Sequence, residues 1–467
     1  MKNILIALTA LCLLVSCNDF VDVVPKGNTI PETVDDLGKM MADGGMSLTN
    51  PMASFSYSNL FIEGYSDDYT ASENPNSVYY TIHRTTTMFS NVLTWADYIY
   101  TIAENDYNWN GLYRSNYVAN YVLANIDEVE EGIDYQRDEV KGQALVHRAM
   151  NFFLLVNLYA KQYDAATAET DLGVPLILEP DINNQYPRET VAKVYGQILD
   201  DLNEALSLLT VDVPEYNNVP GRATAFALRA RVYLWMQNYD QAYADATEAL
   251  KLRSEIIDYN TCSQLMPGIP AYGINGYSTI PQTNPEIMYS RYRTERSNLQ
   301  YSQKMLDIID TENDLRYTLF YGSYEAAGIL DPMMWTRLCH SGIDVSEVWL
   351  TKAEAALRKS SPNATEAIEA LDYVRDRRYL NQNYTAAPTD PDDLLVEILN
   401  ERRREITFTE MSFLDHKRQN ADPTTARPME RTVWGATYTL PVDDPRWQLA
   451  IPLNVCDLNP LLEQNER

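Results

Sequence analysis

Two alanine-rich helical patterns in residues 221–252 constrain the fold more than any other feature of this chain. The alanines recur at spacings of three and four, which places each set on one helix face, at Ala227, Ala230, Ala242, Ala246 and Ala249. Small side chains on a shared face let two helices pack closely. Because the short polar stretch 237–240 separates the two patterns and predicts a turn, we expect residues 221–252 to form a helical hairpin.

The same pattern recurs elsewhere in the chain. It covers residues 348–378, and an earlier copy is split between 140–161 and 191–209, with a further helical stretch at 392–418. Each unit resembles a tetratricopeptide repeat, although an unrelated helical hairpin remains an alternative. Since such hairpins must stack to bury their apolar faces, we expect a mostly α fold, a tetratricopeptide-like helical-hairpin scaffold with repeats around 140–252 and 345–418.

Three long segments of the chain lack this helical pattern. Residues 50–108, 261–340 and 419–447 are interrupted by proline, glycine and asparagine, so they are expected to be loop-rich. Long ordered loops are uncommon and usually functional. We therefore expect these loops to form a binding face.

The first residues have the layout of an export signal. Lys2 precedes an apolar run of about a dozen residues, too short to span a bilayer, which needs roughly 20. The run ends at Ser16-Cys17, which resembles the cleavage box of bacterial lipoproteins, and Asp19 resembles a tag for the outer face of the outer membrane. These features predict a signal peptide at 1–16, a mature chain at 17–467 and lipidation of Cys17. Ordinary cleavage nearby, with Cys17 as an incidental thiol, is the alternative.

The composition restricts the partners. A formal net charge of −29 repels phosphate backbones and anionic lipids, so we expect no nucleic-acid partner and membrane attachment through the lipid anchor only. The remaining thiols, Cys262, Cys339 and Cys456, show no disulfide framework, although one pairing among them stays open.

The motifs of enzymes and metal sites are missing from the sequence. The four histidines form no zinc-ligand spacing, and no nucleophile elbow, P-loop or dinucleotide motif is present. The cluster 181–184 lacks the glycine and distant glutamate of a calcium loop. We therefore predict no catalytic residues, no metal and no cofactor. The 66 acidic residues nevertheless leave a secreted glycoside hydrolase open, since two carboxylates could lie at the required separation.

The order of short motifs along the chain resembles the SusD/RagB family of outer-membrane nutrient-binding lipoproteins. The matching positions run from the lipidated cysteine to the end of the chain: Asp19-Phe20-Val21-Asp22 with Pro25, Trp109, Leu112-Tyr113, Asn120, Leu123, Arg148-Ala149 to Tyr159, Gly173-Val174-Pro175-Leu176, Gly221-Arg222-Ala223-Thr224, Ile451-Pro452, Asn459-Pro460-Leu461-Leu462 and Gln464-Asn465. One departure is Met411-Ser412-Phe413, where the family usually has a glycine and an arginine, which puts the local packing in doubt.

This resemblance implies a cell-surface protein that binds a glycan or related nutrient. It also implies a partner, a SusC-like TonB-dependent transporter, to which an oligosaccharide or polysaccharide is delivered without catalysis. A repeat scaffold for protein partners is a further alternative. The sequence does not name the glycan.

The segment 65–100, weakly helical at most and just before the Trp109 helix, is the expected ligand site. Sugars present apolar faces and hydroxyl edges, so recognition favours exposed rings beside planar hydrogen-bonding groups. This segment and the later loops supply the predicted ligand-binding residues Asp67, Asp68, Arg84, Asn91, Trp95, Tyr98, Tyr272, Tyr277 and Trp335. Trp95 is equally compatible with a place in the core.

Overall fold

A computed structural model describes residues 31–42, 62–129, 133–268, 273–278, 280–292, 299–326, 329–334 and 340–467. Its helices are α2 (Val34–Ala42), α3 (Val78–Thr85), α4 (Thr87–Leu93), α5 (Tyr107–Asn125), α6 (Asp134–Tyr159), α7 (Val191–Leu208), α8 (Arg222–Trp235), α9 (Tyr239–Leu252), α10 (Gln303–Leu306), α11 (Leu315–Phe320), α12 (Val345–Arg358), α13 (Ala364–Arg375), α14 (Pro391–Glu405), α15 (Met411–Gln419) and α16 (Leu453–Leu458). The prediction of a mostly α, tetratricopeptide-like scaffold is confirmed.

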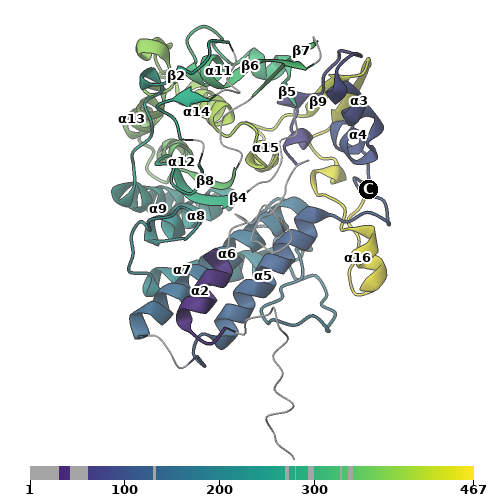
Figure 1. The fold of residues 1–467 in the computed structure, drawn as a ribbon, viewed down its shortest axis with the longest axis vertical. Helices are drawn as coiled ribbons and strands as arrows, with labels where there is room; N and C mark the ends of the chain where they lie inside the picture. The colour runs from purple at the N-terminus through teal and green to yellow at the C-terminus, as the bar shows by residue number, and fades with distance from the viewer. Residues whose placement is uncertain are drawn as a thin grey trace, which may run out of the picture.

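Successive helices pack against one another along the scaffold. Helices α5 to α9 contact one another in chain order, and α9 continues onto α12, which contacts both α13 and α14. Figure 1 shows this arc of helices on one side of the molecule, with α3, α4, β9 and α16 on the other. The long segment between α9 and α12 therefore leaves the scaffold and returns to it.

The alanine faces explain the close packing of α8 against α9. Ala227, Ala230, Ala242, Ala246 and Ala249 are all buried, as their spacing predicts. The turn falls at Gln237, in the left-handed region with φ +58°, and Asn238, whose side chain accepts a hydrogen bond from the Gln241 N–H at the start of α9. The predicted hairpin is confirmed here.

Short antiparallel strand pairs occupy the loop-rich part. The strands are β1 (Tyr69–Thr70), β2 (Ser263–Gln264), β3 (Ile274–Asn275), β4 (Ile287–Tyr292), β5 (Gln300–Tyr301), β6 (Tyr321–Ala326), β7 (Ile329–Met334), β8 (His340–Asp344), β9 (Met429–Val433) and β10 (Ala436–Leu440). Within the described residues they pair as β1–β5, β2–β3, β4–β8, β6–β7 and β9–β10. The segment 65–100, expected to be weakly helical at most, contains the two short helices α3 and α4.

Buried ion pairs join α14 and α15 to the scaffold. The Arg402 guanidinium donates to Glu347 at 3.0 Å and to Asp415 at 2.9 Å, and Arg418 donates to Asp415 and Glu354. Phe413 is fully buried beside them. The departure from the family pattern at 411–413 therefore leaves α15 tightly packed.

No helix among the described residues combines the length and the apolar character needed to cross a membrane.

Candidate functional site

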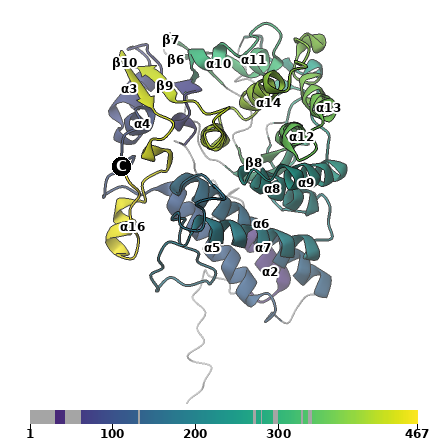
Figure 2. The same cartoon turned by 180° about the vertical axis from the view of Figure 1, so that it is seen from behind.

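Long-range pairing brings three loop segments together at one end of the molecule. Strand β1 pairs with β5 in the register Tyr69↔Tyr301, and the Thr70 hydroxyl donates to the Thr432 carbonyl of β9. Figures 1 and 2 both show α3 and α4 beside the β9 strand. The predicted segment 65–100 is thereby placed next to 299–321 and 429–440.

Asp67 and Asp68 form buried ion pairs that hold these loop segments together. Asp67 accepts hydrogen bonds from Lys304 Nζ at 3.0 Å and Arg427 Nη1 at 3.3 Å, while Asp68 accepts from Arg403. Burial raises the pKa of Asp67, but Arg427, His416 and Lys304 outweigh it and hold the pKa below its ordinary value. Because both carboxylates are buried, they fix the loops and offer no surface to a ligand.

Trp95 lies in the core. Its side chain is 0% exposed, its indole N–H donates to the Tyr65 carbonyl at 2.7 Å, and the Arg431 guanidinium lies 4.8 Å from the ring centre. Of the two interpretations of Trp95 that the sequence leaves open, this burial favours the core.

Arg84 and Asn91 differ in exposure and in partners. Arg84 is exposed on α3, where it donates to the hydroxyl of Tyr80. The Asn91 amide donates to the carbonyls of Tyr98 and Ile99, both at 3.0 Å. Asn91 therefore positions the loop that carries Tyr98.

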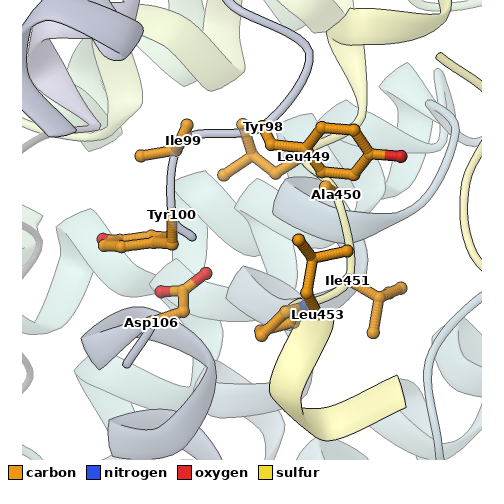
Figure 3. Close-up of a pocket in the computed structure, with 9 residues that line it drawn as sticks. Tyr98, Ile99, Tyr100, Asp106, Leu449, Ala450, Ile451 and Leu453 are labelled. Carbon is orange, nitrogen blue, oxygen red and sulfur yellow. The ribbon is translucent and has the colours of Figure 1, made fainter. Parts of the chain in front are cut away.

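Tyr98 is 39% exposed and lines a narrow pocket, partly open to solvent, whose enclosed space is about that of one water molecule. Figure 3 shows Tyr100 and Asp106 on one side of this pocket, with Ile451 and Leu453 on the other. The pocket thus lies between the 98–106 loop and the segment that leads into α16. The Tyr98 ring offers an exposed apolar face of the kind that stacks on a sugar, although the enclosed space is too small to hold a sugar ring.

Asp106 is held by hydrogen bonds at the start of α5. One carboxyl oxygen accepts from the Asn108 and Trp109 N–H groups, and the other accepts from the Tyr159 hydroxyl at 2.6 Å. Burial raises the pKa of Asp106 to about 6, and these hydrogen bonds only partly counteract the rise. Asp106 therefore supports the pocket wall as a helix cap.

Of the three predicted residues in the later loops, only Tyr277 lies within the described residues. Tyr277 is 8% exposed and packs edge-on against Tyr259 and Phe320. Cys17, Tyr272 and Trp335 lie outside the described residues. The described part of the chain also holds no group of three His, Cys, Asp or Glu side chains arranged to bind a metal.

Five half-buried aromatic side chains, which we call the aromatic rim, lie over a buried cluster that contains Tyr69, Leu93 and Tyr301. They come from α11, β6, the α14–α15 connection and the β9–β10 hairpin, and are Tyr317, Tyr321, Phe408, Trp434 and Tyr438. The stack continues inward, because the Tyr321 ring lies 4.9 Å from that of Tyr317 and 4.9 Å from that of Tyr301.

None of the rim residues was predicted from the sequence. The available signal was the pattern of 429–440, in which alternating residues flank Trp434-Gly435, since a two-residue turn containing glycine is typical of a β-hairpin. The i, i+4 spacing of Tyr317 and Tyr321 was a weaker signal.

Comparison with known families identifies the chain. A SusD-like model, described as starch-binding and associating with the outer membrane, matches residues 19–234, and the SusD family model matches residues 343–466. Together the two matches cover well over half of the chain. The chain belongs to the SusD family.

Individual relatives agree with this assignment. SusD-like protein P38 of Formosa agariphila is 22% identical over 74% of this chain and 79% of its own. A SusD superfamily crystal structure from Bacteroides thetaiotaomicron superimposes with a TM-score of 0.71 and 21% identity, covering 93% of this chain and all of that one. A SusD-like carbohydrate-binding protein from Bacteroides vulgatus gives 0.64 at 17% identity, over 92% and 98%. At such identities these structures show the shared fold.

The SusD-like motifs at the end of the chain have a structural role. Arg188 donates to the carbonyls of Gly173 and Leu172 in the 160–190 segment and to the carbonyl of Glu463 and the amide oxygen of Asn465 near the end of the chain. The Asn465 amide in turn donates to the carbonyls of Tyr159 and Leu449. These motif residues therefore fasten the last segment to the scaffold.

Proposed function

We propose that this protein binds a glycan at the cell surface and passes it to a TonB-dependent outer-membrane transporter. Membership of the SusD family supports the proposal, as do the relatives described as binding carbohydrate. The observation that carries it is the aromatic rim, a group of partly exposed rings that distant loop segments bring together. Half-exposed rings bind the apolar faces of sugars, and adjacent polar groups bind their hydroxyls.

The protein acts in this proposal as a binder and releases no sugar. Affinity electrophoresis against a panel of polysaccharides tests binding, and reducing-sugar assays of the same mixtures test hydrolysis. We expect retardation by at least one polysaccharide without reducing ends being released. Release of sugar by the purified chain would contradict the proposal.

Tyr98 is the residue for testing the pocket. Because its side chain is 39% exposed, Tyr98→Ala removes a ring from the surface with little loss of packing. We expect weaker retardation with a melting temperature close to that of the wild type. Tyr216→Ala is a matched control, since Tyr216 is 49% exposed on a different loop and should leave binding unchanged. Equal binding by both variants would exclude the pocket.

The location at the cell surface rests on lipidation of Cys17, which is part of the proposal. Cys17→Ala should release the protein from membranes and leave glycan retardation unchanged. For the partner, we expect a large outer-membrane barrel to co-purify with the native protein from detergent-solubilised membranes. Its absence from such preparations would count against the transporter while leaving glycan binding untouched.

A further inference from the structure

The β9–β10 hairpin places a tryptophan where the backbone disfavours it. Val433 pairs with Ala436, so Trp434 and Gly435 form a two-residue turn, with φ +53° and φ +78°. Turns with both central residues in the left-handed region are usually made by Asn-Gly or Asp-Gly, because other side chains are strained there. Retaining tryptophan at this position therefore costs free energy that a different residue would avoid.

The indole adds a second cost. Its Nε1 atom is buried and has no hydrogen-bond partner among the residues that the structure describes. A buried donor without an acceptor is unfavourable, since it has lost its water without compensation. The ring itself is half-buried and packs against the cluster beneath the aromatic rim. Two independent features of Trp434 thus oppose folding. Turning the ring outward would relieve the second, because the N–H would regain a hydrogen-bond partner, while the backbone conformation of the turn would stay as it is.

Polar groups suited to sugar hydroxyls surround the hairpin. Glu73 is exposed, and one of its carboxyl oxygens accepts the Trp434 backbone N–H at 2.7 Å. The Thr432 and Thr437 hydroxyls lie 2.9 Å apart on the exposed outer face, and Glu430 is exposed on the same strand as Thr432. Glu73 and Glu430 place two exposed carboxylates beside the hairpin, so a uronic acid or sulfate held against them would be repelled while a neutral sugar would not.

We propose that Trp434 is a mobile stacking residue for a neutral pyranose ring, with the Glu73 carboxylate accepting hydrogen bonds from the hydroxyls of that sugar. On binding, the indole turns from the cluster onto the apolar face of the sugar, and its N–H gains a hydroxyl or water as partner. This deepens the proposed function and rests on it, since it assigns a contact residue and a ligand class to the loop face.

The test uses the full mature chain and the polysaccharide that retards the wild type most strongly. Trp434→Ala and Glu73→Gln are expected to weaken binding about tenfold, the size of one aromatic or hydrogen-bonding contact. Trp434→Phe keeps a ring but removes the N–H, so it should fold at least as stably as the wild type and bind more weakly. Tyr216→Ala again serves as the control for an exposed aromatic elsewhere.

Tryptophan fluorescence tests the movement directly. Adding the selected polysaccharide should shift the emission of the wild type and leave that of Trp434→Phe unchanged. If Trp434→Ala and Trp434→Phe bind like the wild type while Tyr98→Ala does not, the Trp434 proposal is wrong and glycan binding stands. If a polyuronate proves to be the preferred ligand, the neutral class is wrong. If no polysaccharide retards the wild type, the proposed function itself fails.

Discussion

The sequence leaves open whether Trp95 packs in the core or binds ligand, and replacing this residue tests which role it has. The side chain is fully buried, so Trp95→Ala removes a large core ring, a change that typically costs about 3–5 kcal/mol. The backbone offers no relief, because Trp95 has φ +50° and alanine is also strained in this region. Against a typical total stability of about 5–15 kcal/mol, such a loss would be severe.

Trp95→Phe isolates the hydrogen bond. It keeps an aromatic ring in the core but removes the donor that the Tyr65 carbonyl accepts at 2.7 Å. Leaving that carbonyl buried without a partner should cost about 1–3 kcal/mol. The Arg431 guanidinium also loses its indole neighbour, although it keeps its hydrogen bonds to the carbonyls of Tyr69 and Leu93.

Urea unfolding followed by circular dichroism measures both variants, with polysaccharide retardation recorded for each under native conditions. We expect a large drop in stability for Trp95→Ala, an intermediate one for Trp95→Phe, and retardation by the folded fraction of Trp95→Phe close to wild type. Tyr98→Ala should show the opposite pattern. Unchanged stability of Trp95→Phe together with loss of binding would refute the core assignment.

Three further predictions concern the framework around the site. Gly221→Ala should destabilise the protein by about 1–3 kcal/mol or more, because the added Cβ would lie 2.6 Å from Pro214 Cδ, and the melting temperature reports this. Arg188→Ala should lower the melting temperature and expose the last residues to carboxypeptidase, since the buried carbonyl of Gly173 and the half-buried carbonyl of Leu172 lose their donor. The pKa of Asp106 rises from 3.8 to about 6 on folding, so the wild type loses stability relative to Asp106→Asn as the pH rises through that range, by about 3 kcal/mol at most. Urea unfolding of the two proteins between pH 3.5 and 7 measures the difference.

The scaffold could be predicted because its signals are local. The spacing of Ala227 and Ala230 and of Ala242, Ala246 and Ala249 identifies helix faces within single turns, and each of these alanines is buried. The capping role of Asn238 is equally local. The family motifs near Gly173 and Asn465 predicted membership correctly, although what they do structurally emerged only from their shared contacts with Arg188.

The site could be predicted only in part because it depends on contacts between distant segments. Pairing of Tyr69 with Tyr301 brings the rim residues together, and no local pattern contains that information. The carboxylates of Asp67 and Asp68 could accept hydrogen bonds from sugar hydroxyls. They are instead engaged in ion pairs with Lys304, Arg427 and Arg403. The hairpin around Trp434 was missed because tryptophan stands where asparagine or aspartate normally identifies such a turn.

The distribution of charge bears on which glycan such a face can receive. Many arginines are buried against carboxylates, among them Arg231 with Glu347 and Arg418 with Glu354. Each buried pair removes one cation and one anion from the surface, so the excess of 66 acidic over 37 basic residues is shared among fewer exposed groups. Acidic groups therefore make up a larger share of the exposed charges than they do of all charged residues in the composition. An acidic glycan would therefore find no long-range attraction, and under the proposed function recognition would depend on contacts with rings and hydroxyl-binding groups such as the rim and the Glu73 carboxylate.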